Sequence, residues 1–138
     1  TRPSYNYIGY IEIPSINIKK GLVDKNSVYN NVNYNVQIMK ESSYPDVDKG
    51  LFILAAHNGT CYNCYFKHLD NIKNNDLIYV NYKNKKYTYK VTKKYTVNKT
   101  GYVSIYRNND VTSLALVTCT WGTKNKQTVV IAELINKE

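Results

Sequence analysis

Cys119 is the residue of this chain whose side chain is best suited to covalent chemistry. It follows the apolar run 114–118 and precedes a polar stretch, so its thiol is expected at the mouth of a strand. A cysteine there is either a small buried core residue or a nucleophile, and a nucleophile needs a nearby base or cation to hold it as thiolate. The residue type and its place in the pattern leave both interpretations open.

Two histidines are available as that base. His57 ends a second apolar run, 51–56, so the sequence predicts two buried strands that each end in a reactive side chain and a loop. A histidine in this position serves either as a base or as a hydrogen-bond partner of backbone groups. His68 instead follows the helical spacing of residues 65, 66 and 69 and is expected to face solvent. His57 is therefore the candidate partner of Cys119.

Cys61 and Cys64 form a single C-x-x-C pair. Zinc usually takes four ligands from two such pairs or from cysteines and histidines, and the sequence has no second pair, so we predict no metal site. The strand-to-helix context of a thioredoxin-like motif is also missing, although redox exchange stays open. We interpret the pair as incidental, near the entrance of the site, and able to oxidise outside the cell. No Gly-rich phosphate loop or paired-carboxylate motif is present, so no cofactor is predicted.

The charge of the chain favours an acidic partner or surface. Its 138 residues carry 19 Lys and Arg against 10 Asp and Glu, for a net charge of +9. Only two of the basic residues are arginines, and the 15 tyrosines mostly alternate with lysine and threonine without an RNA-binding motif, so we predict no nucleic-acid partner. The apolar runs are far shorter than the roughly 20 residues that cross a bilayer, so none is expected to span a membrane. The N-terminus shows no signal-peptide pattern either.

Alternation of apolar and polar residues with a period of two dominates the chain. It predicts short strands at residues 9–13, 16–18, 36–39, 51–56, 77–82, 86–94, 114–118 and 128–134. Asn84 and Lys85 are expected in a hairpin turn between two of them. Helical spacing is limited to residues 65–72 and, more weakly, 24–31. With no repeat, linker or composition break, the sequence predicts one mainly β domain over residues 1–138, an antiparallel-rich sandwich or barrel with one or two short helices.

Three blocks of the sequence resemble the sortase family. Residues 114–119, Leu-Ala-Leu-Val-Thr-Cys, resemble its Thr-Leu-x-Thr-Cys signature, residues 8–16 resemble its opening strand, and residues 53–59 resemble its histidine strand. Their order along the chain is also that of the family. Sortases are extracytoplasmic cysteine transpeptidases of mainly Gram-positive bacteria, built on an eight-stranded β-barrel with short helices. The resemblance implies this fold, with Cys119 as the nucleophile and His57 as its partner.

The sequence departs from the family at its third active-site residue, an arginine near the start of the last strand. The corresponding stretch, residues 124–130, contains no arginine. Depending on the register of this strand, Gln127 or Lys126 takes the position. Gln127 would donate amide hydrogen bonds to a developing oxyanion without bringing charge, whereas Lys126 would bring a point charge without the planar fork of arginine.

Four residues beside the cysteine and the histidine are candidates for contact with the substrate: Asn58, Thr118, Thr120 and Trp121. The two threonines are equally well explained by the preference of threonine for strands. Trp121 would either wall the binding groove or cap the barrel.

The resemblance implies acyl transfer through a thioacyl-enzyme. The acyl donor is expected to be an LPxTG-like sorting signal of a surface protein, and the acceptor a cell-wall precursor amine or a pilin lysine. The full-length protein is expected outside the cytoplasm, held by a membrane anchor that this sequence lacks. A class B-like or class D-like subclass is expected, because residues 29–34 resemble class B whereas the connection between residues 94 and 114 is short for it. The missing arginine leaves two alternatives, a catalytically impaired sortase-like module that binds peptides and a cysteine peptidase that only hydrolyses.

Overall fold

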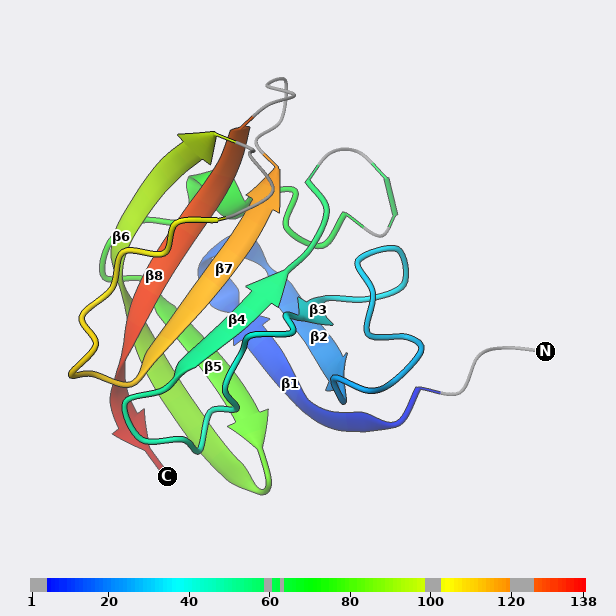
Figure 1. Ribbon diagram of the computed structural model, residues 1–138, viewed down its shortest axis with the longest axis horizontal. Coiled ribbons are helices and arrows are strands. Elements are labelled where there is room, and N and C mark those ends of the chain that lie inside the picture. The colour runs from blue at the N-terminus through cyan, green and yellow to red at the C-terminus, as the bar shows by residue number, and fades with distance from the viewer. Residues whose placement is uncertain (1–4, 59–60, 63, 99–102, 120–125) are drawn as a thin grey trace.

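An eight-stranded β-sheet curls into a nearly closed barrel (Figure 1). The computed structural model describes residues 5–58, 61–62, 64–98, 103–119 and 126–138, with Cys119 described by its backbone. The strands are β1 (Tyr7–Ile13), β2 (Ile18–Val23), β3 (Gln37–Ile38), β4 (Leu51–Ala55), β5 (Leu77–Tyr82), β6 (Lys85–Asn98), β7 (Ser113–Cys119) and β8 (Lys126–Lys137). Two 3₁₀-helices, η1 (Pro14–Ile16) and η2 (Leu69–Asn71), occur in the described ranges. Neither of these helices has the length and apolar character of a segment that crosses a membrane.

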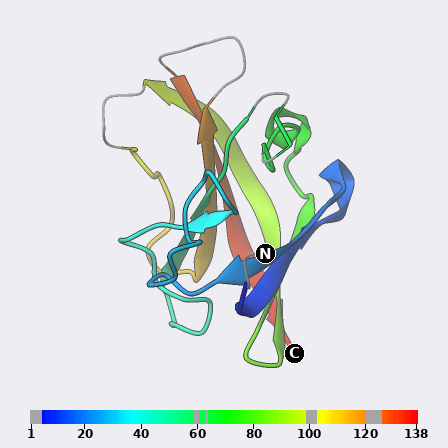
Figure 2. The same cartoon turned by 90° about the vertical axis from the view of Figure 1, so that its right-hand side faces the viewer.

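The strands follow the order β2-β1-β5-β6-β8-β7-β4-β3 across the sheet. Every neighbouring pair is antiparallel except β4 and β7, which are parallel. The barrel closes where β2 and β3 approach each other, and there Asn35 Nδ2 donates a hydrogen bond of 3.0 Å to the carbonyl of Gly21. Figure 2 shows the β5–β6 turn at one end of the barrel, and the C-terminal ends of β6 and β7 with the start of β8 at the other. The mainly β barrel predicted from the sequence is confirmed.

The continuous apolar run of β7 is buried on both faces of the sheet. Leu114 and Leu116 belong to the main core, whereas Ala115 and Val117 belong to a second cluster on the other face. The chain after β6, yellow in Figure 1, runs back across the sheet, and residues 103–105 help to cover this second cluster. Successive residues of a strand face opposite sides, so a strand covered on both sides shows no polar alternation.

A two-residue turn joins β5 to β6. Lys83 and Asn84 have φ values of 50° and 64°, and Tyr82 pairs with Lys85. Two consecutive residues with positive φ are typical of the type I′ turn, whose twist matches that of the flanking strands. The turn predicted at Asn84 and Lys85 is thus wrong by one residue, because Lys85 already belongs to β6.

β6 and β8 are longer than their apolar periodicity predicts. β6 extends beyond residue 94 to Asn98, and β8 begins at Lys126 rather than at residue 128. The two strands stay paired up to Asn98 and Lys126, both of which are exposed. Exposed polar residues give no apolar signal, so cross-strand pairing sets these strand ends.

The segment 65–72 is only partly helical. η2 is its single helical element, and the rest forms turns and extended chain. Phe66, Leu69 and Ile72 are nevertheless fully buried in the main core. The apolar spacing therefore identified the buried side of this segment correctly but overestimated its helical length.

Residues 24–31 form turns, so the helix predicted there is wrong. The Asp24 carboxylate accepts a hydrogen bond of 3.0 Å from Asn26 N, and the Ser27 hydroxyl accepts one of 3.1 Å from Tyr29 N. Short-range bonds from Asp and Ser side chains offer the backbone an alternative to the helix.

The strand predicted at residues 16–18 is also wrong. Pro14 opens η1, and Asn17 ends it with a left-handed φ of 59°. Proline fixes φ near the helical value and suits the first turn of a helix. β2 therefore begins at Ile18 and pairs back onto β1.

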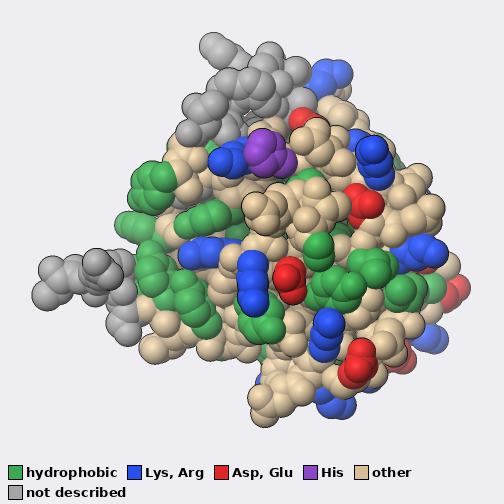
Figure 3. Space-filling view, turned by 180° about the vertical axis from the view of Figure 1, so that it is seen from behind, with side chains coloured by type: hydrophobic (Ala, Val, Ile, Leu, Met, Phe, Trp, Pro, Cys, Tyr) green, Lys and Arg blue, Asp and Glu red, His purple; other side chains and the backbone are tan. Residues whose placement is uncertain are grey.

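Tyrosines gather around Lys20 near the N-terminal end of the described chain. The Nζ of Lys20 lies 5.8, 5.7 and 5.1 Å from the ring centroids of Tyr5, Tyr7 and Tyr65. On the face seen in Figure 3, hydrophobic side chains with Lys or Arg among them lie beside the N-terminal end. Cation–π contacts at exposed sites contribute about 0.5–1 kcal/mol each. They link β1 and β2 to the segment before η2.

Tyr89 is the site of an expected stabilising substitution. Its ring is fully buried in the main core, and its hydroxyl has no hydrogen-bond partner in the described part of the chain. Burial raises the pKa of this phenol, so the hydroxyl stays protonated. Removing an unpaired buried hydroxyl relieves its desolvation cost. Tyr89→Phe is therefore expected to raise the free energy of unfolding by about 1 kcal/mol, measured by urea titration.

Tyr95→Phe is the matched control for this substitution. The Tyr95 hydroxyl donates a hydrogen bond to the carbonyl of Ser104 and accepts one from Tyr106 N, both of 2.8 Å. Losing these bonds should lower the free energy of unfolding by about 1 kcal/mol. A loss of stability in both variants would contradict our interpretation of Tyr89.

Candidate active site

The parallel pair β4 and β7 sets the backbone of the candidate site. Ala55 is paired with Val117, and Ala56 N donates a hydrogen bond of 3.3 Å to the carbonyl of Val117. Thr118 Oγ1 donates a hydrogen bond of 2.6 Å to the carbonyl of Ala56, across a sequence separation of 62 residues. The pairing of the two strands thus continues just beyond the end of β4.

The residues predicted as base and nucleophile come next in this register. Ala55 and Val117 are 117 − 55 = 62 residues apart, and His57 and Cys119 are 119 − 57 = 62 residues apart. The C-terminal ends of β4 and β7 lie side by side (Figure 1). The register therefore puts backbone positions 57 and 119 at the same end of these two strands. Pairing between distant parts of the chain, rather than a local motif, brings these positions together.

β8 brings Gln127 to the other side of Cys119. In the antiparallel β7–β8 pair, Cys119 is the cross-strand partner of Gln127. Lys126 lies one residue away along β8, pairs with Asn98 of β6 and is exposed. Directly opposed residues are the closest neighbours across an antiparallel pair. The register therefore puts Gln127, rather than Lys126, opposite the predicted nucleophile.

His57 is partly buried and is held from two sides. Its Nε2 lies 3.1 Å from Asn33 Oδ1, and its carbonyl accepts a hydrogen bond of 3.1 Å from Phe66 N. Asn33 lies 24 residues before His57, in the loop between β2 and β3. Reasoning from the sequence missed Asn33, because no spacing or residue pattern marks a contact between two loops.

Of the four residues predicted to contact substrate, the structure describes two, Asn58 and Thr118. Asn58 follows His57, and both polar atoms of its amide are buried without a hydrogen-bond partner among the described residues. Thr118 is buried, and its hydroxyl takes part in the β4–β7 pairing. Thr120 and Trp121 lie outside the described residues. Contact of each with substrate stays a prediction.

Arg107 binds carbonyl groups away from the candidate site, so it does not replace the family's active-site arginine. It donates hydrogen bonds of 3.0, 3.1 and 3.2 Å to the carbonyls of Lys49, Gly50 and Val111. These residues precede β4 and β7, whereas the candidate site follows the ends of the two strands. Arg107 therefore fastens loops at the opposite end of the barrel. The other arginine, Arg2, lies outside the described residues.

Cys61 and Cys64 form a disulfide in the loop after β4, with their Cα atoms 5.1 Å apart. Cys64 is buried, whereas Cys61 is exposed. A disulfide restricts the unfolded chain, so this one lowers the conformational entropy that folding has to overcome. No three His, Cys, Asp or Glu side chains of the described ranges come together as metal ligands.

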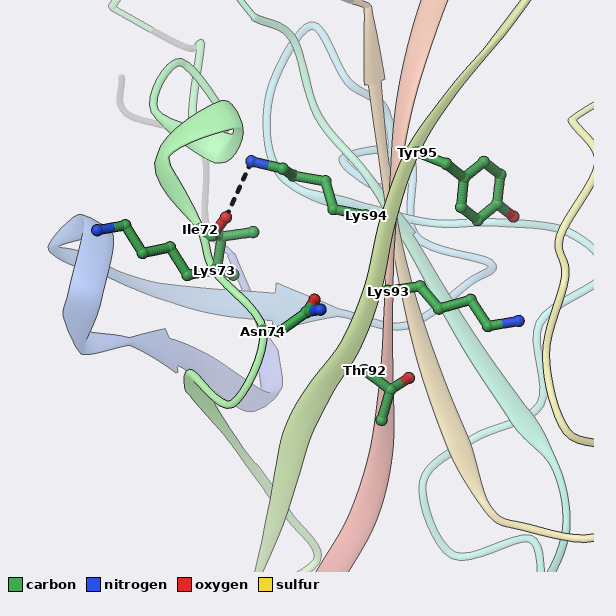
Figure 4. Close-up of a pocket in the computed structure, with 7 residues that line it drawn as sticks. All are labelled: Ile72, Lys73, Asn74, Thr92, Lys93, Lys94 and Tyr95. Carbon is green, nitrogen blue, oxygen red and sulfur yellow. Dashed lines mark hydrogen bonds between the residues drawn. The ribbon is translucent and has the colours of Figure 1, made fainter.

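A depression of about 720 Å³ lies between residues 72–74 and β6, and none of the predicted site residues lines it (Figure 4). There Lys94 Nζ donates hydrogen bonds of 2.6 and 3.0 Å to the carbonyls of Asp70 and Ile72. The Asp70 carboxylate also accepts a hydrogen bond of 3.0 Å from the hydroxyl of Thr128. The depression therefore lies where these hydrogen bonds connect η2 and Ile72 to β6 and β8.

The family model of the sortase domain matches residues 11–135. The chain belongs to the sortase family. Among solved structures, this sortase is similar to sortase C from Clostridium perfringens SM101, with 27% identity, a TM-score of 0.78, and coverage of 95% of this chain and 71% of that chain. It is also similar to sortase C1 from Streptococcus agalactiae, with 29% identity, a TM-score of 0.80, and coverage of 94% of this chain and 68% of that chain. A third similar structure is sortase A of Listeria monocytogenes, with 25% identity, a TM-score of 0.77, and coverage of 96% of this chain and 89% of that chain.

No curated protein matches the sequence of this sortase. The family and the eight-stranded fold that the sequence resemblance implied are confirmed. The class B-like or class D-like subclass stays a prediction, since the similar structures named above are sortases C and A. The family is one of cysteine transpeptidases, and this defines the chemistry against which the site is interpreted below.

Proposed function

We propose that this sortase is a cysteine transpeptidase. It cleaves an LPxTG-like sorting signal and transfers the acyl group to a cell-wall precursor amine or a pilin lysine. The observation that carries the proposal is the shared register of β4 and β7, in which His57 and Cys119 correspond to each other two positions after the last paired residues, Ala55 and Val117. The cross-strand position of Gln127 supports a third role, at the oxyanion.

In the first half-reaction, the Cys119 thiolate attacks the carbonyl carbon of the threonine in the sorting signal. A tetrahedral intermediate forms, and its oxyanion is stabilised by backbone N–H groups and the Gln127 amide. The carbon–nitrogen bond then breaks as His57 protonates the departing amine. The product is a thioester between Cys119 and the acyl group, and the C-terminal part of the sorting signal leaves.

In the second half-reaction, an acceptor amine attacks the thioester carbonyl. His57, now neutral, takes the proton that the amine loses, and the carbon–sulfur bond breaks. The acyl group ends on the acceptor amine and Cys119 returns to the thiolate. Thiolate suits both steps, because it is a strong nucleophile and an acceptable leaving group.

Asn58, Thr118, Thr120 and Trp121 are proposed to contact the sorting signal. The best supported of these is Asn58, because a primary amide offers both donors and an acceptor, and a buried amide without a partner is costly. A peptide backbone would satisfy both atoms once the Asn58 side chain turned out of its buried position.

The proposed setting is the outer face of the cell membrane. We propose that residues 1–138 form one catalytic domain and that a membrane anchor holds the full-length protein. The net charge of +9 would favour an anionic envelope, an effect that weakens as salt concentration rises.

Gln127 favours a second candidate function, a catalytically impaired module that binds sorting peptides. A neutral amide stabilises an oxyanion less than a guanidinium does, so acylation would be slow. A purely hydrolytic peptidase is the third candidate.

Mass spectrometry of the intact protein with a panel of sorting peptides tests the proposed function. We expect a thioacyl adduct on the wild type, none on Cys119→Ala, and a ligated product when a glycine-based amine is added. Saturable peptide binding without an adduct would instead support the binding module. An adduct that is released only as free acid, whatever the amine concentration, would support the peptidase.

A further inference from the structure

The Asn33 side chain contacts His57 from the loop between β2 and β3. The atoms in contact are Asn33 Oδ1 and His57 Nε2, 3.1 Å apart. A carbonyl oxygen only accepts hydrogen bonds, so this contact requires a proton on Nε2. In a neutral imidazole one ring nitrogen carries the proton and the other accepts. The contact therefore selects the Nε2–H tautomer of His57 and leaves Nδ1 as the acceptor.

The loop holds Asn33 in place before any substrate arrives. Asn31 organises the turn, because its side-chain Oδ1 accepts a hydrogen bond of 2.9 Å from Asn33 N and its carbonyl accepts bonds of 2.9 Å from both Tyr34 N and Asn35 N. The Asn35 side chain then ties the end of the turn to Gly21 of β2. The backbone that carries the acceptor is thus positioned by the fold.

The backbone that carries the His57 side chain is also held on two sides. The His57 carbonyl accepts a hydrogen bond from Phe66 N, and the Phe66 ring is fully buried in the main core. On the other side, Ala56 is joined to β7 by its N–H and its carbonyl. A hydrogen bond between side chains whose backbones are already held leaves only side-chain rotation to be ordered, which suits a side chain that positions another.

We propose that Asn33 is a positioning residue that holds His57 in the Nε2–H tautomer, so that Nδ1 is the nitrogen that exchanges the proton during acyl transfer. In the first half-reaction Nδ1–H gives its proton to the departing amine, and in the second Nδ1 accepts one from the incoming amine. Nε2 keeps its proton throughout and stays bonded to Asn33. The catalytic consequence rests on the proposed transpeptidase function, whereas the tautomer does not.

The tautomer is tested by NMR of the ring nitrogens in ¹⁵N-labelled protein, at a pH where the imidazole is neutral. We expect His57 to show a protonated Nε2 and an unprotonated Nδ1. Asn33→Ala should shift the signals toward a mixture of tautomers, and Asn33→Asp, which keeps an acceptor oxygen, should retain the wild-type pattern. His68, exposed and outside this contact, serves as the internal control and should not change. A protonated Nδ1 in the wild type, or His57 signals that ignore Asn33→Ala, would overturn the proposal.

Kinetics of sorting-peptide cleavage give the second readout. We expect Asn33→Ala to lower kcat about tenfold with KM within about twofold, and Asn33→Asp to recover most of the loss. Thermal unfolding of both variants should match the wild type, because Asn33 is exposed. A change in KM alone, or equal losses in both variants, would contradict a positioning role. If the wild type shows no turnover, the proposed function fails while the NMR experiment still decides the tautomer.

Discussion

Gln127→Arg is expected to raise kcat/KM for cleavage of a sorting peptide about a hundredfold. Gln127 is the cross-strand partner of Cys119, so a longer side chain from this position reaches the region where the oxyanion develops. A guanidinium adds charge and a second, parallel donor to the one that the Gln127 amide supplies in the proposed mechanism, and one oxyanion donor is worth about 10²–10³ in rate. The measurement is steady-state cleavage of a fluorogenic peptide by the two proteins side by side.

Lys126→Arg is the control for this gain. It introduces the same guanidinium one residue away, at an exposed position that pairs with Asn98 instead of Cys119. We expect it to change kcat/KM by less than about threefold, in line with the small effect of an exposed charge. A larger gain from Lys126→Arg than from Gln127→Arg would mean that the register does not determine the oxyanion contact.

His57→Ala should lower kcat for transpeptidation about a thousandfold. In the proposed mechanism the imidazole protonates the departing amine and then deprotonates the incoming one, and general acid–base catalysis contributes about 10²–10⁴ in rate. KM for the peptide should change little, since binding does not depend on proton transfer. Rates of peptide ligation to an added amine give both parameters.

His68→Ala provides the comparison, because the described chain has no other histidine and His68 is exposed just before η2. We expect its activity to match the wild type. Equal losses in the two variants would point to a general effect on folding, and an active His57→Ala would remove His57 from the proposed mechanism.

Much of the fold follows from side-chain alternation. The strand predicted at residues 77–82 coincides with β5, and the two unbroken apolar runs at residues 51–56 and 114–118 correspond to strands buried on both faces. At residues 24–31, one of the places where the prediction failed, hydrogen bonds from short polar side chains replaced the helix. Such bonds depend on the rotamers of single residues, which a periodic pattern does not contain.

The candidate site was predictable only in part, for a physical reason. Cys119 and His57 could be singled out because each follows an apolar run, which is a local property of the sequence. The choice between Gln127 and Lys126 needed the β7–β8 register, and Asn33 needed the packing of one loop against another. Both are non-local, so spacing along the chain carries no signal for them.

The parallel neighbours β4 and β7 also determine when during folding the candidate site would be assembled. They are 62 residues apart in sequence, and β5 and β6 lie between them along the chain. Contacts between such distant segments form late, since a long loop must close first. Turnover regained in a refolding experiment would then report the completed barrel, and a fragment ending before β7 would stay inactive until the remaining strands were supplied in trans.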